Sequence, residues 1–440
     1  MPVSSARAAA FTILLRVERE SAYAVELLHS ALLDELSPSD RNLTMEIVMG
    51  VLRWRSALDA TFAGFIPRAL NKLDLEVLIA LRMGTYQLAF LTRIPLHAVV
   101  NETVELVNQA KKRSASGMVN AVMRKLKPNL DPYASNLKGL EYLSTALAHP
   151  QWLAARWVEH FGYGRADLIC GYDQSIPVTT LRLSHVEDED ELTRSGIQLI
   201  PGALMKNARR VKAGDVIGTE LFRNGKVAIQ DEGSQLVAAL VGKGERILDC
   251  CAAPGGKTAA LATALPEAEI VAAELHPHRA RLLLQMAPQE NVQVITADAL
   301  QLPFAADFDR VLADVPCSGT GTLARNPEIK WRLTLDDIQD LQARQIAILN
   351  AAMKHVAPGG RIIYSTCSLE PEENEQVVSA CLQANRGFRI VLVKDELLRL
   401  QELGVLVWKD VDQLVKGDFL RTIPGACPCD GFFAAILEQQ

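Results

Sequence analysis

Several features are missing from this 440-residue sequence. No Cys or His residues have the spacing of a zinc site, because Cys427 and Cys429 lack a second pair of ligands nearby. The apolar stretch within the first 15 residues is too short to span a membrane, and it lacks a convincing cleavage site. Internal repeats and low-complexity segments are also absent. We therefore expect a cytoplasmic globular protein without a metal or membrane partner, and assign no role to Cys427 or Cys429.

The composition is that of an ordinary globular chain, with 49% apolar and 22% charged residues. The length predicts about three domains, each able to bury its own core. A chain of this size does not need disulfides to fold, so its eight cysteines favour a reducing compartment. We expect a monomer.

The net charge of −6 argues at first against a nucleic-acid partner. The charge is uneven, however, because the first 150 residues hold 17 Lys and Arg against 14 Asp and Glu. Basic clusters stand at residues 111–113 and at Arg124, Lys125 and Lys127. Local patches steer a nucleic acid more than the total charge does. Taken alone, such short runs are explained better as solvated helix ends.

Residues 1–140 are predicted to form an all-α domain. Apolar residues recur there at helical spacing, in residues 8–15, 47–52, 78–88 and 99–107. One of these helices is expected to begin at Asn101 or Thr103, with acidic residues in its first turn. Residues 148–230 differ, because short strand-like runs such as 178–183 and 226–229 predict a small α/β module. The acidic run 187–191 within it indicates a solvated helix start.

Residues 231–440 alternate regularly between strand-like and helical segments, which predicts an α/β domain with a mainly parallel sheet covered on both faces. The expected strands are residues 246–249, 270–274, 292–297, 309–313 and 361–366. A long helix over residues 335–356 is expected to open with a capping box from Thr334 to Asp337. Residues 432–437 are expected to add a final edge strand.

A loop rich in small residues follows the first expected strand, as Cys-Cys-Ala-Ala-Pro-Gly-Gly-Lys-Thr from residue 250 to 258. Small residues at a strand's carboxyl end let a ligand approach the backbone, and the next helix offers N–H donors. A phosphate-binding P-loop is excluded, because the Gly required six residues before Lys257 is replaced by Cys251.

Two carboxylates follow the next strands. Glu274 can accept both hydroxyl groups of a ribose, and Asp298 can accept the amino group of an adenine. Each one alone is explained better as a helix N-cap. Three loops in order at one sheet edge, without a cradle for pyrophosphate, favour a nucleoside such as S-adenosylmethionine over a dinucleotide.

Two cysteines lie just past the ends of the fourth and fifth strands, Cys317 after Asp314 and Cys367 after residue 366. A lone cysteine is usually a small buried hydrophobe, but a pair at neighbouring strand ends is typical of an active site. A thiolate that adds to C6 of cytosine makes C5 nucleophilic toward an electrophilic methyl group. Asp314, partly protonated, can stabilise the charge that develops on the ring, and the second sulfur can help remove the C5 proton. This reasoning leaves open which cysteine attacks.

Four segments resemble the RNA cytosine-C5 methyltransferase family, at residues 252–258, 314–318, 326–331 and 366–374. The resemblance covers nearly the whole chain. Residues 1–140 resemble the NusB-type helical RNA-binding fold, and residues 148–230 resemble the small RRM-like module of the family. Residues 231–440 resemble its Rossmann-like, S-adenosylmethionine-dependent methyltransferase domain.

The resemblance implies that Cys367 is the nucleophile and that Cys317 assists product release, because DNA enzymes use the cysteine of a Pro-Cys pair instead. DNA is therefore not the expected substrate. It implies contacts to S-adenosylmethionine from Cys251, Ala252, Ala253, Pro254, Gly255, Gly256, Lys257, Glu274, Asp298 and Asp314. Glu274 stands where many relatives have Asp, which leaves the affinity for the ribose in question.

The resemblance also implies the target, one cytosine of small-subunit (16S) ribosomal RNA. Two alternatives remain at this point. The same chemistry on tRNA is compatible with the catalytic motifs, and only the NusB-like domain favours rRNA. A non-catalytic NusB-like assembly factor is disfavoured, because it has no need to keep Cys317, Cys367 and Asp314 together.

Overall fold

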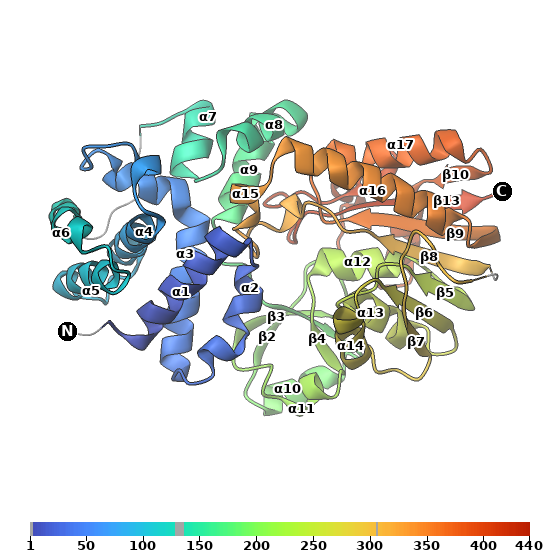
Figure 1. Cartoon of the computed structure of the whole chain (residues 1–440). Helices are drawn as coiled ribbons and strands as arrows, with labels where there is room; N and C mark the ends of the chain where they lie inside the picture. Colours follow the sequence, from blue (N-terminus) through green and yellow to red (C-terminus); the bar gives the residue numbers. More distant parts are fainter. Residues whose placement is uncertain (1–2, 128–135, 305–306) are drawn as a thin grey trace. The chain divides into compact units, whose positions relative to one another are not determined.

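The computed structural model describes residues 3–127, 136–304 and 307–440 (Figure 1). The chain forms two compact units, the first comprising Met1–Ile176 and Leu323–Arg332 and the second comprising Pro177–Thr322 and Leu333–Gln440. None of the helices in the described ranges combines the length and apolarity that a membrane crossing requires.

The first unit is built from helices, as predicted for its N-terminal part. They are α1 (Ser5–Glu20), α2 (Ala24–Leu28), α3 (Pro38–Ala63), α4 (Leu75–Phe90), α5 (Leu96–Gln109), α6 (Ser116–Lys125), α7 (Gly139–Glu141), α8 (Gln151–Phe161), α9 (Tyr163–Asp173) and α15 (Ile329–Arg332). The expected start of α5 at Asn101 or Thr103 is wrong, because the helix begins after Pro95, whose extended conformation makes it the N-cap. Apolar faces of α1, α3, α4 and α5 form the core of this unit.

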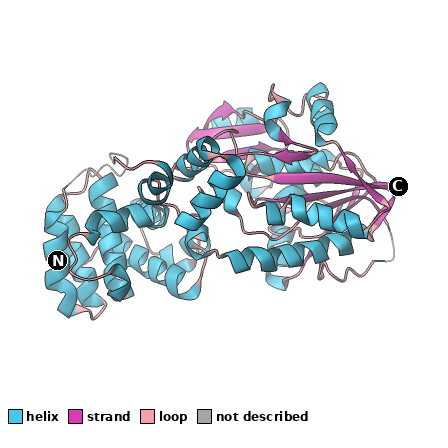
Figure 2. Ribbon diagram, turned by 90° about the horizontal axis from the view of Figure 1, so that it is seen from above, coloured by secondary structure: helices cyan, strands magenta, loops and turns pink. Residues whose placement is uncertain are grey.

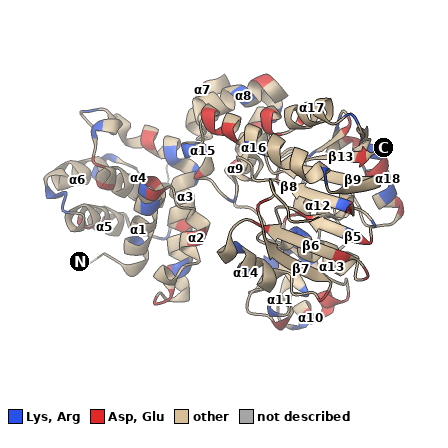
Figure 3. Cartoon of the chain, turned by 45° about the vertical axis from the view of Figure 1, so that its right-hand side comes forward, with Lys and Arg blue, Asp and Glu red and all other residues tan. Residues whose placement is uncertain are grey.

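The residues of the two predicted basic clusters lie at or between helix ends, and Figure 3 shows Lys and Arg in blue. Lys111 and Arg113, in the connection from α5 to α6, are exposed, whereas Lys112 forms an ion pair of 3.1 Å with Asp74. Lys125, at the end of α6, lies over the ring of Phe65. The predicted basic clusters are therefore accessible on the surface of the helical unit.

A short piece of the C-terminal sequence, Leu323–Arg332, belongs to the helical unit. Trp331 donates its indole N–H to the carbonyl of Leu52 at 2.6 Å, and Lys330 donates to the carbonyl of Arg53 at 3.1 Å. Burial lowers the pKa of Lys330 to about 7. The sequence had placed this segment in the 231–440 domain, and the predicted boundary at residue 148 likewise differs from the division at residue 176.

The second unit contains a four-stranded antiparallel sheet in the order β2-β3-β1-β4. Its elements are β1 (Thr180–Leu183), α10 (Asp188–Arg194), β2 (Gln198–Pro201), β3 (Ala208–Ala213), α11 (Glu220–Arg223) and β4 (Val227–Ile229). The acidic run forms the start of α10, as predicted. One face of the sheet carries Leu181 and Leu183 into a small apolar core.

The other face of this small sheet is covered by α12 (Glu232–Leu240). Ala208 packs against Leu236 of α12, and Arg210 forms an ion pair of 2.9 Å with Glu232. Because α12 occupies this face, the strands of the small module do not present it as an open surface.

The larger sheet of the second unit has the order β11-β12-β13-β9-β8-β5-β6-β7, with β10 paired to β13. Figure 2 shows the strands in magenta and the helices in cyan. Its strands are β5 (Arg246–Asp249), β6 (Glu269–Glu274), β7 (Val292–Thr296), β8 (Phe308–Asp314), β9 (Val356–Thr366), β10 (Phe388–Val391), β11 (Val415–Lys416), β12 (Phe419–Arg421) and β13 (Phe433–Gln439). The five strands from β7 to β9 are parallel, as predicted.

Helices cover both faces of this sheet because its central strands are apolar on both sides. Ile247 contributes to the core under α12, α13 (Gly256–Ala264) and α18 (Val393–Glu402), whereas Leu248 contributes to the core under α16 (Leu335–Met353) and α17 (Glu375–Ala384). Helix α14 (Pro277–Met286) packs with α13 beside β6 and β7. The predicted two-sided α/β domain is confirmed.

Two expected details of this domain are wrong. Helix α16 has the predicted Thr334 capping box but ends at Met353, because Val356 already pairs with Phe308 as part of β9. Strand β13 is not an edge strand, since it pairs with β9 on one side and with β12 and β10 on the other.

Candidate active site

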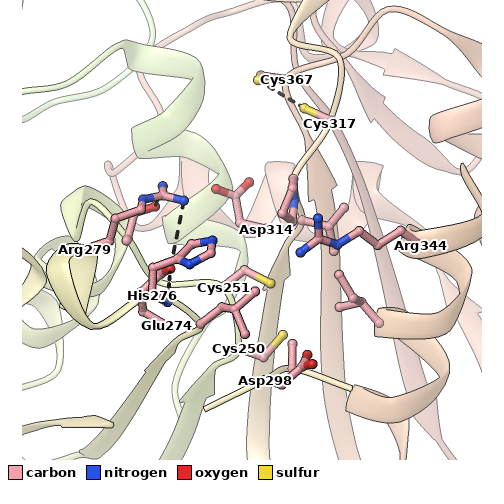
Figure 4. Close-up of a pocket in the computed structure, with 16 residues that line it drawn as sticks. Cys250, Cys251, Glu274, His276, Arg279, Asp298, Asp314, Cys317, Arg344 and Cys367 are labelled. Atoms are coloured by element: carbon pink, nitrogen blue, oxygen red, sulfur yellow. Dashed lines mark hydrogen bonds and ion pairs between the residues drawn. The ribbon is translucent and has the colours of Figure 1, made fainter. Parts of the chain in front are cut away.

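Strands β8 and β9 place the two candidate cysteines together. The strands are parallel neighbours, and Asp314 at the end of β8 lies opposite Ser365 near the end of β9. Cys317 and Cys367 follow in the two loops at the same edge of the sheet (Figure 4). Their Sγ atoms are 3.3 Å apart. The sequence predicted this meeting of two strand ends, and the structure confirms it.

The surroundings of Cys317 determine the protonation state of its sulfur. The hydrogen bond with Cys367 and then burial raise the pKa of Cys317 well above the ordinary value. Cys317 is therefore a neutral thiol at physiological pH and can donate its proton toward Cys367.

Lys257 and Ser365 hold the carboxylate of Asp314 from two sides. Lys257 donates from Nζ to Oδ2 at 2.6 Å, and the Ser365 hydroxyl donates to Oδ1 at 2.7 Å. Burial lowers the pKa of Lys257, but the charge and hydrogen bond of Asp314, with smaller contributions from Cys367 and Asp249, raise it overall. Lys257 therefore stays positively charged beside Asp314, within electrostatic range of Cys367.

Glu373 ties the two cysteine loops to each other, and sequence reasoning assigned it no role. Its carboxylate accepts hydrogen bonds from the hydroxyl groups of Ser318 and Ser368, the neighbours of the two cysteines. It also accepts from the Ser318 backbone N–H at 2.8 Å and from Gln345 at 2.9 Å. Glu373 is fully buried, and burial raises its pKa. The only sequence signal was its place in the segment 366–374.

Close backbone packing supports the Cys367 loop from the other side. The Gly321 N–H donates to the Cys367 carbonyl at 2.9 Å, and the Gly431 N–H donates to the Gly321 carbonyl at 2.8 Å. A Cβ atom on Gly321 would stand 2.2 Å from the Gly431 oxygen, so no larger residue fits there. The loop that carries the candidate nucleophile is therefore fixed by two neighbouring loops.

A cavity of about 230 Å³ opens at this sheet edge (Figure 4). Of the predicted site residues it is lined by Cys251, Ala253, Glu274, Asp298, Asp314, Cys317 and Cys367. It is also lined by residues that the sequence analysis did not single out, namely Cys250, Leu275, His276, Arg279, Ala299, Val315, Pro316, Arg344 and Ile348. Arg344 projects from α16, a helix whose sequence carried no site motif.

The remaining predicted loop residues do not line the cavity: Ala252, Pro254, Gly255, Gly256 and Lys257. Gly255 has a φ of 117°, and a Cβ atom there would stand 2.9 Å from a methyl carbon of Leu283. Its role is to let the loop turn closely over α14. Lys257 points its amine to Asp314, so its observed partner is a site carboxylate.

The groups around the cavity fit a nucleoside cofactor. Glu274 is 5% exposed and accepts the His276 N–H with Oε1, which leaves Oε2 for the hydroxyl groups of a ribose. Asp298 accepts the Leu300 N–H with Oδ1, which leaves Oδ2 for an amino group. Arg279 is within 4.0 Å of Glu274, and its guanidinium also donates to the Ala253 carbonyl.

The other cysteines near the cavity are not activated. The hydrogen bond with Cys250 and then burial raise the pKa of Cys251 well above its ordinary value. Cys250 directs its thiol to the Leu312 carbonyl at 3.2 Å. Among the described residues, no group of His, Cys, Asp and Glu is arranged to hold a metal ion.

An open, mainly parallel sheet with helices on both faces and a carboxylate-lined nucleoside cavity at its carboxyl edge defines a class, the S-adenosylmethionine-dependent methyltransferases. A family model described as 16S rRNA methyltransferase RsmB/F matches residues 238–438, and the NusB family model matches residues 4–128. Neither model covers residues 129–237, so the RRM-like character of the module at 148–230 stays a prediction.

Full-length relatives agree with both models. The probable ribosomal RNA small subunit methyltransferase B of Bacillus subtilis is 32% identical, with all of both chains covered. The ribosomal RNA small subunit methyltransferase B of Vibrio cholerae is also 32% identical, with 100% of this chain and 98% of that protein covered. The chain belongs to the RsmB/F family of 16S rRNA methyltransferases. It is an enzyme that uses S-adenosylmethionine, and the non-catalytic alternative no longer stands.

Solved structures show the same fold. The crystal structure of PH0851 superposes with a TM-score of 0.78 at 23% identity, covering 100% of this chain and 99% of that one. The structure of NSun6 from Pyrococcus horikoshii with SFG has a TM-score of 0.56 at 18% identity, covering 66% of this chain and 98% of that one.

Proposed function

We propose that this enzyme methylates C5 of one cytosine in small-subunit rRNA through a covalent bond between Cys367 Sγ and C6 of the base. The observation that carries the proposal is the pairing of Cys367 with Cys317 at 3.3 Å, beside Asp314 and Lys257. Methylation of a ring nitrogen or an oxygen requires no such pair of sulfur atoms. Carbon C5 of cytosine does, because it becomes nucleophilic only after addition at C6.

In the first step the Cys367 thiolate forms a bond to C6, and the electron pair of the 5,6 double bond moves to C5 and on toward C4 and N3. Asp314 accepts a hydrogen bond from the amino group of the base, and Lys257, which donates to Asp314, supplies positive charge near N3, where negative charge develops. S-adenosylmethionine, when bound, supplies an electrophilic methyl group, which C5 takes up.

In the last step the C5 proton leaves, the 5,6 double bond returns, and the bond from C6 to Cys367 breaks. Cys317 is suited to receive this proton late in the reaction. The largest cause of its raised pKa is its hydrogen bond with Cys367, and this cause disappears once the Cys367 sulfur is bonded to carbon. Cys317 can then release its own proton to solvent through the cavity and act as a base.

The decisive experiment compares two variants with S-adenosylmethionine and small-subunit rRNA. Cys317→Ala is expected to accumulate a protein–RNA complex that survives a denaturing gel, because release is blocked after methyl transfer. Cys367→Ala is expected to give neither complex nor methylated RNA. Cys381→Ala, at a buried cysteine of α17, is the matched control and should behave like the wild type.

Nucleoside analysis of the digested RNA locates the methyl group. The proposal requires 5-methylcytidine in small-subunit rRNA and none in tRNA incubated in parallel. A complex formed by Cys367→Ala instead of Cys317→Ala would reverse the two roles. Methyl groups at another position of the base would contradict the C5 chemistry altogether.

A further inference from the structure

The second unit contains another cavity, of about 320 Å³, which shares no lining residue with the cofactor cavity. Its walls come from the end of β1, the turn before β3, the outer ends of α12 and α13, and the segment after α18. Its volume is at the lower end of the range of about 300–1,000 Å³ that is typical of small-molecule sites. Nothing in the chemistry at Cys367 uses it.

Arg182 of β1 is the unusual residue of this cavity. It is 6% exposed, and its Nε donates to Gln230 Oε1 at 3.0 Å. Among the described residues no carboxylate forms an ion pair with it, and burial lowers its pKa to about 10. Burial of a cation without a counter-ion is unfavourable unless an anion neutralises it. Most buried arginines of the second unit have such an anion, as Arg421 has in Glu375.

The charge of the residues that line the cavity also favours an anion. Lys206 is a second cation at the cavity, and no Asp or Glu is among the residues that line it. Polar groups that can donate or accept hydrogen bonds are supplied by Ser184 and Asn207. An anion that enters here meets positive charge and hydrogen-bond donors without a repelling carboxylate.

Helices α12 and α13 line the cavity mainly with small apolar side chains. These are Ala238, Ala239, Ala260 and Ala264, with Leu261, and the same helices add the polar Gln235 and Thr263. Alanine side chains leave room for a planar ring to lie against the helices. The cavity therefore combines an anion-binding end with a surface suited to an aromatic base.

The wall that carries Lys206 is held in place by backbone pairing. Lys206 donates its N–H to the Val405 carbonyl at 3.0 Å, and Met205 forms an isolated antiparallel bridge with Leu406. The Met205 N–H also donates to the Glu232 carboxylate at 3.0 Å. These contacts fix the cavity without any ligand, so binding requires little reorganisation.

We propose that this cavity binds a nucleoside monophosphate unit, with the phosphate at Arg182 and Lys206 and the base on the alanine surface of α12 and α13. The unit can be part of the RNA substrate or a free nucleotide. The proposal is independent of the C5 chemistry, because it concerns binding without methyl transfer. It gives the small module a role in nucleotide binding, although α12 covers one face of its sheet.

The test measures binding of AMP by calorimetry to the full chain saturated with S-adenosylhomocysteine. Adenine is not the base that is methylated, and the saturated cofactor cavity is closed to AMP. Arg182→Met and the cavity-filling Ala264→Leu should each weaken AMP binding at least tenfold, and adenosine without phosphate should bind the wild type at least tenfold more weakly. Arg223→Met, at an exposed arginine outside the cavity, is the matched control.

A second arm replaces AMP with a fragment of small-subunit rRNA. Weaker binding of the fragment by both cavity variants assigns the site to the RNA chain, whereas weaker binding of AMP alone assigns it to a free nucleotide. If both variants bind both ligands like the wild type, or if adenosine binds as well as AMP, the proposal is overturned. Should Arg182→Met fail to fold or to bind S-adenosylhomocysteine, Arg182→Gln and Ala264→Leu carry the same comparison.

Discussion

Cys317 and Cys367 lie with their Sγ atoms 3.3 Å apart, although 50 residues separate them in the chain. Each sulfur is partly accessible at the cofactor cavity. A disulfide requires a separation of about 2.05 Å, so a small movement of the two loops closes the bond. The pair that serves catalysis is therefore also open to oxidation.

We predict that hydrogen peroxide inactivates the enzyme through this pair. Peroxide oxidises the Cys367 thiolate to a sulfenic acid with loss of hydroxide, and the Cys317 thiol then displaces water to form the disulfide. Activity should fall to below about a tenth and return with dithiothreitol, because only the reduced pair supplies a thiolate. Peptide mapping without reductant should find one cross-link, between the peptides of Cys317 and Cys367.

The control for oxidation is Cys317→Ser, in which Cys367 lacks a sulfur partner. Its exposure to peroxide should leave a sulfenic or higher acid on Cys367 and no cross-link. Dithiothreitol should then restore a smaller share of the variant's covalent binding to RNA than the share of activity that it restores in the wild type. Inactivation of the wild type that leaves this cross-link unformed would show that the two sulfur atoms do not approach each other further.

Glu373 provides a second prediction, about the alignment of the two loops. Glu373→Gln keeps the size of the side chain but replaces one acceptor oxygen by an amide NH2 group. The variant can therefore not accept from the two serine hydroxyls on one oxygen and also from the Ser318 N–H and Gln345 on the other. We expect kcat to fall by about 10- to 100-fold, which corresponds to the roughly 1–3 kcal/mol of a lost buried hydrogen bond. The KM for S-adenosylmethionine should change little, since Glu373 does not line the cofactor cavity.

Glu402→Gln is the matched control, because it makes the same change at an exposed carboxylate of α18. It should retain kcat. A large increase in the KM for the cofactor in Glu373→Gln, with kcat unchanged, would contradict the role of Glu373 in aligning the cysteines.

The sequence was sufficient to predict the parallel sheet and to predict that one carboxylate and two cysteines meet at its edge. The reason is that residues at the carboxyl ends of neighbouring parallel strands must share one edge, so Asp314, Cys317 and Cys367 were placed by their positions after strands alone. The same rule placed Glu274 and Asp298 at the cofactor cavity.

Long-range polar contacts were beyond sequence reasoning. Lys257 was assigned to the cofactor because of the loop in which it lies, but its partner Asp314 is 57 residues away. The periodicity of a sequence does not predict such long-range pairs. Lys330 shows the same limit, since a charged residue predicted in the C-terminal domain is buried in the helical unit. Pairing also decided the place of Val356. The helical spacing assigned it to the helix over residues 335–356, but it pairs with Phe308 in β9.

Glu274 provides a third prediction, about the cofactor. Its free Oε2 is the group that we expect to hold the ribose. Glu274→Ala should therefore weaken the binding of S-adenosylhomocysteine about tenfold or more, because a hydrogen bond to a charged acceptor contributes about 1.5–3 kcal/mol. Glu274→Asp should bind more tightly than Glu274→Ala, because a carboxylate remains. Calorimetry decides this, and equal affinity of Glu274→Ala and the wild type would remove Glu274 from the cofactor site.

The last prediction concerns Asp249, which ends β5 behind the cofactor loop. It is 1% exposed and accepts a hydrogen bond of 2.7 Å from the Thr258 hydroxyl. Burial, reinforced by the charge of Asp314 and opposed by Thr258 and Lys257, raises its pKa to about 7. An aspartic acid in an unfolded chain has a pKa of about 3.9.

Between about pH 4 and pH 7 the folded chain therefore keeps a proton at Asp249 that the unfolded chain has released. Stability from this group is fully present below the unfolded pKa of about 3.9, and it is lost as the pH rises through the folded pKa. Asp249→Asn stays neutral at every pH and abolishes this dependence. From pH 5 to pH 7.5 the free energy of unfolding of the wild type should fall by about 2–3 kcal/mol more than that of the variant.

Urea denaturation of the wild type and of Asp249→Asn at pH 5 and pH 7.5 gives the free energies of unfolding. The unfolding of the second unit is the transition to be followed. Asp340→Asn, at an exposed carboxylate of α16, is the control and should follow the wild type, because its charge is solvated in both states. Equal losses in the wild type and Asp249→Asn would mean that Asp249 is ionised in the folded protein at pH 5. In that case the positive charge of Lys257 compensates the burial of Asp249 as well as that of Asp314.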